Sequence, residues 1–148
     1  MRTKNVDWQE QPRIYEINTW PWLQALSRIY KHDISLNNIP PEVFNQELKF
    51  FDAIWLMGVW ERSPQSREIA LNHPGLQQEY HKTLSDFKPD DVVGSPYSIF
   101  DYHVDHHLGG DDGLENFRDQ LTERNIHLLL DYVPNHVAVD HPWILEES

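Results

Sequence analysis

The residues with the clearest chemical potential lie in the stretch 127–136, which reads His-Leu-Leu-Leu-Asp-Tyr-Val-Pro-Asn-His. Its leucines are too few for a helix and predict a strand buried on both faces. Asp131 follows without a break, and an unpaired carboxylate at the end of an apolar strand is costly. Pro134 has no N–H for strand pairing, so Asn135 and His136 are expected just beyond the strand, where α/β folds build their sites.

A second group of chemically capable residues is the run 103–107, which reads His-Val-Asp-His-His. Histidine and aspartate at short spacing can ligate zinc, and His136, Asp140 and His141 are further candidate ligands. A metal-dependent hydrolase is therefore one alternative function. The spacing matches no zinc motif that we can identify, however, and a solvated polar loop also accounts for the run. Elemental analysis would separate these interpretations.

Composition and charge limit the classes of partner. The chain has 148 residues, enough for one domain by length, and its six Trp, six Tyr and six Phe argue against disorder. A formal net charge of −12 disfavours nucleic acid and anionic membranes, and it is compatible with a neutral, hydroxyl-rich ligand such as a sugar. The absence of cysteine excludes disulfides and thiolate metal sites.

The same composition bears on location. No stretch approaches the roughly 18 apolar residues of a membrane-spanning helix. The N-terminal residues lack the apolar core of a signal peptide, so a cytoplasmic location is expected.

The elements that must position these residues follow a strand–helix pattern. Residues 13–18, 53–57 and 128–133 predict three short strands. Helices are predicted over 42–50, with prolines at its entry, and over 112–124, with one apolar face. This order is typical of βαβ units in a parallel sheet, which places the chain in the α/β class.

The helix at 112–124 has the most complete end signals. Asp112 is predicted to be its N-cap, with Glu115 completing a capping box. Asn125 suits the left-handed conformation that often follows a helix.

The remaining segments predict less regular structure. Residues 23–30 have partial helical spacing, and Pro21 is expected to break the first strand so that Trp20 and Trp22 lie in a loop. A further helix is expected to begin near Gly75 and to end within 81–87. Loops are predicted at 60–64 and, longer and aromatic, at 94–102.

The predicted sheet is incomplete on physical grounds. An open three-stranded parallel sheet would leave its last strand with an unpaired hydrophobic edge. A complete (β/α)8 barrel needs about 250 residues. The chain is therefore expected to be part of a larger fold.

Several motifs resemble the α-amylase family (glycoside hydrolase family 13). Residues 131–136 resemble the Asp-x-x-x-Asn-His motif at the end of the third barrel strand in that family. The other matching segments, in chain order, are 13–16, 54–56, 94–102, 108–110 and 140–143. The resemblance implies that residues 13–148 form the N-terminal portion of a (β/α)8 TIM barrel, about three strand–helix units, preceded by an extension at 1–12.

The resemblance also implies roles for individual residues. The tyrosine matching Tyr97 stacks on a sugar ring, and the histidine matching His136 hydrogen-bonds its hydroxyls. The aspartate matching Asp131 holds neighbouring groups in place. The asparagine matching Asn135 ligates structural calcium in some members, although one candidate ligand does not make a site. Many members carry aspartate where this chain has Ser98.

The activity implied is cleavage or transfer of α-glucosidic bonds by a retaining mechanism, with an α-glucan or small α-glucoside as substrate and no required cofactor. In the family the catalytic carboxylates belong to the fourth, fifth and seventh strands, so none is expected among these residues. Retaining hydrolysis needs two carboxyl groups about 5–5.5 Å apart. The chain alone is therefore expected to be inactive and poorly soluble.

Other interpretations of the same residues remain open. A non-catalytic carbohydrate-binding or degenerate fragment would bind sugar without turnover. Tyr97 could instead pin a loop as a core aromatic, and His136 could be a satisfied structural histidine, although we weigh both below the sugar-binding interpretation. The tryptophans at 20, 22, 55 and 60 are expected to pack rather than to bind sugar.

Overall fold

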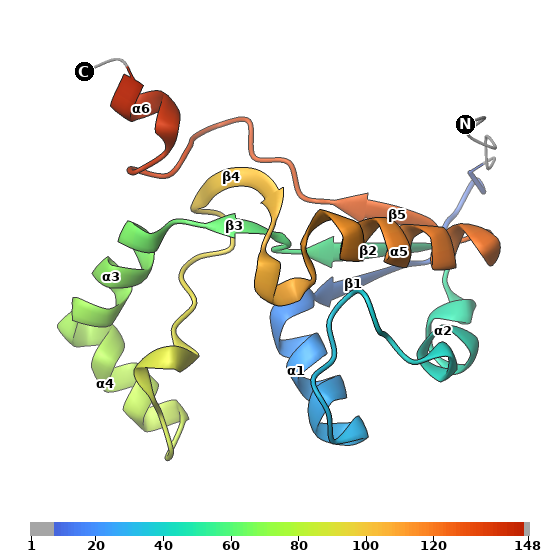
Figure 1. The fold of residues 1–148 in the computed structure, drawn as a ribbon, viewed down its shortest axis with the longest axis horizontal. Helices are drawn as coiled ribbons and strands as arrows, with labels where there is room; N and C mark the ends of the chain where they lie inside the picture. Colours follow the sequence, from blue (N-terminus) through green and yellow to red (C-terminus); the bar gives the residue numbers. More distant parts are fainter. Residues whose placement is uncertain (1–7, 147–148) are drawn as a thin grey trace. The chain divides into compact units, whose positions relative to one another are not determined.

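The computed structural model describes residues 8–146, which fall into two compact units. Unit 1 comprises Met1–Val59 and Val104–Tyr132, and unit 2 comprises Trp60–His103 and Val133–Ser148. Residues 1–7 of the predicted N-terminal extension lie outside the described residues, as do residues 147–148. Figure 1 follows the chain through both units.

Unit 1 is built on a parallel sheet of three strands, as predicted. The strands β1 (Ile14–Asn18), β2 (Ala53–Met57) and β5 (His127–Leu130) lie in the order β1-β2-β5, so β2 is central (Figure 1). Ile54 lies opposite Tyr15 on one side and Leu128 on the other. The predicted bounds of β2 are confirmed. The prediction that the last strand is buried on both faces is wrong, because β5 is an edge strand and its residues are half-buried.

Helices pack on this sheet around an aromatic core. They are α1 (Thr19–Tyr30), α2 (Pro41–Gln46), the 3-10 turns η1 (Leu48–Phe50) and η3 (His106–Leu108), and α5 (Gly110–Glu123). Phe117 of α5 is fully buried, with its ring 5.5 Å from that of Phe44 and 6.1 Å from that of Trp22. The apolar face predicted for the helix at 112–124 therefore forms the centre of the core.

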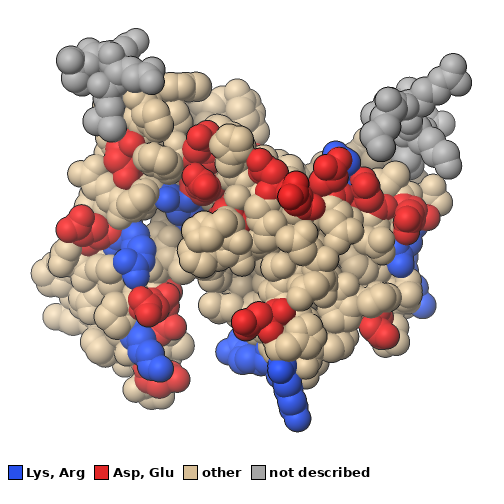
Figure 2. All heavy atoms as spheres, in the orientation of Figure 1, with Lys and Arg blue, Asp and Glu red and all other residues tan. Residues whose placement is uncertain are grey.

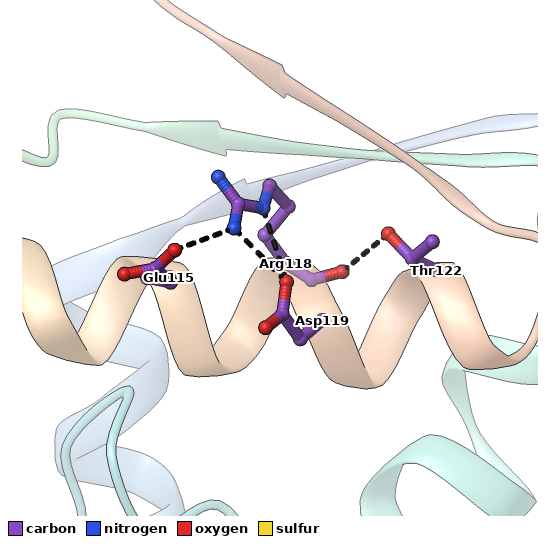
Figure 3. Close-up of polar contacts among 4 residues, drawn as sticks. All are labelled: Glu115, Arg118, Asp119 and Thr122. Atoms are coloured by element: carbon purple, nitrogen blue, oxygen red, sulfur yellow. Dashed lines mark hydrogen bonds and ion pairs between the residues drawn. The ribbon is translucent and has the colours of Figure 1, made fainter. Parts of the chain in front are cut away.

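The outer face of α5 carries a charged network (Figure 3). The Arg118 guanidinium lies 2.9 Å from a Glu115 oxygen and 3.0 Å from an Asp119 oxygen. Hydrogen bonds to Asp119 and then Glu115 raise the pKa of Arg118 further above its usual range. The Thr122 hydroxyl donates to the Arg118 carbonyl at 2.8 Å. Such exposed pairs contribute about 1 kcal/mol at most, so α5 is held mainly by its buried face.

Three further predictions in unit 1 need correction. Trp20 and Trp22 are helical rather than in a loop, because Pro21 falls in the first turn of α1, where a proline removes no helical hydrogen bond. The helix predicted over 42–50 is divided into α2 and η1.

The third correction concerns the start of α5. This helix begins at Gly110 after Gly109, whose φ of 117° suits glycine, so Asp112 lies in the first turn and is not the N-cap. The left-handed conformation predicted for Asn125 is confirmed by its φ of 57°.

Unit 2 contains shorter elements: β3 (Trp60–Arg62), α3 (Pro64–Asn72), α4 (Pro74–Thr83), the 3-10 turn η2 (Pro89–Asp91), β4 (Ile99–Val104) and α6 (Pro142–Glu146). The last residue of β4 belongs to unit 1. The helix expected near Gly75 is α4.

The loops predicted at 60–64 and 94–102 are wrong in part, because strand pairing between β3 and β4 supplies order that neither short segment signals alone. From α3, the Arg67 guanidinium donates to the carbonyls of Val92 at 2.6 Å and Pro89 at 3.1 Å, which holds the segment before β4.

The surface carries many acidic side chains, as the net charge of −12 predicts. Figure 2 shows acidic side chains spread across one face, with basic side chains among them. Over residues 8–146, no helix is long and apolar enough to cross a membrane.

Truncation of Phe117 tests the core of unit 1. The variant Phe117→Ala should lower the free energy of unfolding by about 3–5 kcal/mol, because it leaves a cavity between α5 and its neighbours. Phe50→Ala is the matched control, since Phe50 is 55% exposed and should change the stability far less. Urea unfolding followed by circular dichroism measures both, and equal effects would contradict this description of the core.

Candidate functional site

Asp131 lies just beyond β5 in unit 1, and both of its carboxylate oxygens accept hydrogen bonds. The Trp55 indole N–H donates to Oδ1 at 2.8 Å, and the Gly58 backbone N–H donates to Oδ2 at 2.6 Å. Asp131 is only 8% exposed, so these donors supply the partner that a buried carboxylate requires. The carboxylate therefore ties the end of β5 to the end of β2.

A second contact fixes the same edge of the sheet. The Thr19 hydroxyl, fully buried at the start of α1, donates to the Met57 carbonyl at 2.9 Å. Asp131 and Thr19 together connect the carboxyl ends of β1, β2 and β5. This is the edge where α/β barrels place their functional groups.

Tyr97 and His136 come together in unit 2. His136 Nε2 lies 3.0 Å from the Tyr97 carbonyl oxygen. Because a carbonyl can only accept, we assign the hydrogen to Nε2, which leaves Nδ1 as the acceptor facing the Asn135 amide nitrogen at 3.4 Å. Both His136 and Asn135 are exposed, and Tyr97 is 45% exposed.

The backbone around this pair is held from two sides. The Tyr102 hydroxyl on β4 accepts from the Val133 N–H at 3.0 Å, and the Ala138 N–H donates to the Ile99 carbonyl at 3.2 Å. Tyr97 itself sits in a turn closed by the Ser98 N–H donating to the Ser95 carbonyl at 3.1 Å. The pair is therefore presented on an ordered surface of unit 2, while Asp131 belongs to unit 1.

Asp140 anchors the segment that follows the pair. The Ser63 hydroxyl donates to Oδ1 at 2.6 Å, and the Gln65 N–H, at the start of α3, donates to Oδ2 at 3.0 Å. Burial alone would raise the pKa of the Asp140 carboxyl, but the hydrogen bonds from Ser63 and Gln65 outweigh it and hold the pKa below its ordinary value. Asp140 thus has a structural role within unit 2.

Only some of the predicted metal ligands lie close enough together to share an ion. Among residues 8–146, the one group of three or more side chains that could hold an ion is Asp105, His106 and His107 in unit 1. His136, Asp140 and His141, the further candidates, are not part of it.

The calcium role expected of Asn135 stays a prediction. The amide nitrogen of Asn135 faces His136, so only its oxygen is left to ligate. A Ca²⁺ ion takes about 6–8 oxygens, so a site here would need further ligands besides Asn135. No step is therefore assigned to calcium.

Sequence reasoning missed several residues that build these sites. Trp55 lies within the predicted strand 53–57 and Gly58 follows it, but their donation to Asp131 depends on a contact across strands that no local pattern signals. Ser63 carried a local signal, because Ser-Pro at 63–64 is a frequent N-cap followed by a first-turn proline.

Comparison with known proteins places most of the chain in one family. The family model for the α-amylase catalytic domain matches residues 46–148. A curated relative, the probable oligo-1,6-glucosidase 2 of Bacillus subtilis (strain 168), is 33% identical over 61 residues, which cover 37% of this chain. That match spans only 11% of the relative's length.

Solved structures share the fold of most of the chain. Eubacterium rectale Amy13B superposes with a TM-score of 0.56 at 18% identity, covering 93% of this chain and 21% of that one. A maltogenic α-amylase, AmyB, from Thermotoga neapolitana gives 0.56 at 21% identity over 90% and 26% of the two chains. An α-amylase from Geobacillus thermoleovorans in complex with acarbose gives 0.51 at 22% identity over 91% and 25%.

Asp131→Asn tests the bridge between β2 and β5. An amide keeps one acceptor oxygen but turns an N–H₂ group toward either Trp55 or Gly58, which are both donors. The free energy of unfolding should fall by about 1–3 kcal/mol. Asp86→Asn, at an exposed position, is the control. Identical urea midpoints for the two variants would show that the bridge contributes nothing.

The Asp140 contacts predict a pH dependence of stability. Because folding lowers the pKa of this carboxyl, its stabilisation is complete above the ordinary value of 3.8 and is lost as the pH falls toward the lowered value. Asp140→Asn should therefore flatten the acid side of the stability–pH profile, measured by urea unfolding at successive pH values. The exposed Asp86→Asn should retain the parent profile, and a parent-like profile for Asp140→Asn would refute the assignment.

Proposed function

Because this chain belongs to the α-amylase family, we propose that it supplies part of the sugar-binding site of a glycosidase or transglycosidase acting on α-glucosidic bonds. The observation that carries the proposal is the contact between the His136 ring and the Tyr97 backbone carbonyl, which brings two residues with exposed side chains to one surface of unit 2. Both residues come from segments that match the family's motifs.

The two side chains suit the two kinds of surface that a pyranose offers. The Tyr97 ring can cover the C–H face of a sugar, which removes apolar area from water. His136 has its Nε2–H committed to the Tyr97 carbonyl, so the group that it offers a sugar hydroxyl is the Nδ1 acceptor. A sugar O–H would then replace the long contact from Asn135 at 3.4 Å.

Asp131 has a supporting role in this proposal. Its oxygens accept from Trp55 and Gly58, which commits the carboxylate to holding the ends of β2 and β5 together rather than to attacking a sugar. We therefore assign the retaining chemistry to carboxylates outside these 148 residues. In support, the chain spans about a fifth to a quarter of the similar solved chains, 21% of Amy13B and 26% of AmyB.

Ligand titration of the purified chain tests the proposal. Binding of a maltooligosaccharide, followed by isothermal calorimetry, should weaken about tenfold in Tyr97→Ala, because the lost ring contact is worth about 0.5–1.5 kcal/mol plus its buried area. Tyr15→Ala is the matched control: Tyr15 is 40% exposed, lies in unit 1 and stacks on Phe51. Equal binding by both variants would reject Tyr97 as a sugar contact.

A parallel assay separates the enzyme from a simple binding fragment. The 148-residue chain should not hydrolyse a chromogenic α-glucoside, and turnover would contradict the assignment of the catalytic carboxylates. An antibody against this segment then reports the mass of the native polypeptide. A species of about 50 kDa or more, the scale of a complete barrel with appendages, supports a whole enzyme. A species no larger than this chain supports a non-catalytic sugar-binding protein.

A further inference from the structure

We propose that Asp105, His106 and His107 bind a divalent metal ion of the zinc class, such as Zn²⁺, Co²⁺ or Ni²⁺, at the surface of unit 1. One ligand atom from each residue lies within 4.8 Å of the other two. The group contains neither Tyr97 nor His136, so the inference does not depend on sugar binding.

The turn that carries these residues fixes the carboxylate. Asp105 caps the 3-10 turn η3, and its Oδ1 accepts from the His107 backbone N–H at 2.9 Å. The Asp105 side chain is 12% exposed, which leaves it few alternative rotamers. One ligand is therefore preorganised by the backbone of the turn itself.

The η3 turn is anchored to the loop before α2. The Leu36 N–H donates to the Leu108 carbonyl at 2.8 Å, and the Asn37 side-chain amide donates to the Gly109 carbonyl at 2.9 Å. Added bulk at Gly109 would meet Asn37 at 3.1 Å, which shows how closely the two segments approach. A metal site on this turn would rest on a well-supported backbone.

The donor atoms have distances suitable for a shared ion. His107 Nδ1 lies 2.8 Å from Asp105 Oδ1, and His106 Nδ1 lies 3.8 Å from the same oxygen. Ligands of a tetrahedral ion with bonds of about 2.0–2.1 Å are about 3.3 Å apart, between these two values. The imidazole rings have centroids 3.8 Å apart and are tilted by 38° to each other, so both reach the same region of space.

The donor types select the class of metal. Two imidazoles and one carboxylate suit zinc and its neighbours in the first transition row, whereas Ca²⁺ and Mg²⁺ prefer oxygen-only sites. On binding, the ion replaces the hydrogen between His107 Nδ1 and Asp105 Oδ1. That hydrogen moves to Nε2 of the same ring, so the imidazole stays neutral.

Access and charge also favour a cation here. The side chains of His106 and His107 are 78% and 61% exposed, which leaves an open path and room for a water or hydroxide ligand. The Trp20 ring lies 5.5 Å from the His107 ring and backs one side of the group. The chain's net charge of −12 raises the local concentration of cations.

Calorimetric titration of the chelator-treated, untagged chain with ZnCl₂ near neutral pH tests the site. Saturable, equimolar binding with a micromolar or lower Kd is expected. His106→Ala and His107→Ala should each weaken binding by about tenfold or more, and the double variant should abolish it. Because both side chains are exposed, the variants should keep the parent's circular dichroism spectrum.

His32→Ala is the matched control, since His32 is an exposed histidine of unit 1 outside the group. It should bind Zn²⁺ as the parent does. The proposal is overturned if the parent shows no saturable binding at millimolar Zn²⁺. It is also overturned if the folded double variant binds as tightly as the parent, because the ion would then occupy other side chains.

Discussion

The buried carboxylate of Asp131 is the constraint on which the sheet of unit 1 depends. A charge at 8% exposure is tolerated only with good partners, and here the Trp55 indole and the Gly58 amide supply them. Trp55 lies in the middle of β2 and Gly58 lies just beyond its end, so satisfying the charge also fixes how β5 ends beside its neighbour. The loops that leave this edge start from a defined position.

In unit 2, the carboxylate of Asp140 has a comparable positioning role. Its buried apolar side chains are few among the described residues, with Ile99, Val92 and Ala138 as the main ones. Polar contacts therefore do more of the positioning. Asp140 reaches the start of α3, and the Tyr102 hydroxyl holds the backbone at Val133, so the segment bearing His136 is fixed at both ends.

The sequence predicted well what depends on local pattern. The three strands, their parallel arrangement and the conformation of Asn125 follow from apolar runs, spacing and residue type. The pairing of β3 with β4 and the Ser63–Asp140 contact were missed, because each joins segments far apart in the chain. The loop predicted around Pro21 is wrong for a different reason: a proline is equally compatible with the end of a strand and with the first turn of a helix. The roles of Tyr97, His136 and Asp131 in binding stay predictions.

The discontinuity of unit 1 has a kinetic consequence. Its central strand β2 ends at Met57 and pairs with β5, which begins at His127, and closing a loop of that length costs about 4 kcal/mol in chain entropy before any contact offsets it. Pairing of β3 with β4 shortens the effective loop, because both strands lie within it. Early formation of the β3–β4 pair would accelerate the folding of unit 1. The rate at which unit 1 refolds would then depend on strands that are not part of its own sheet.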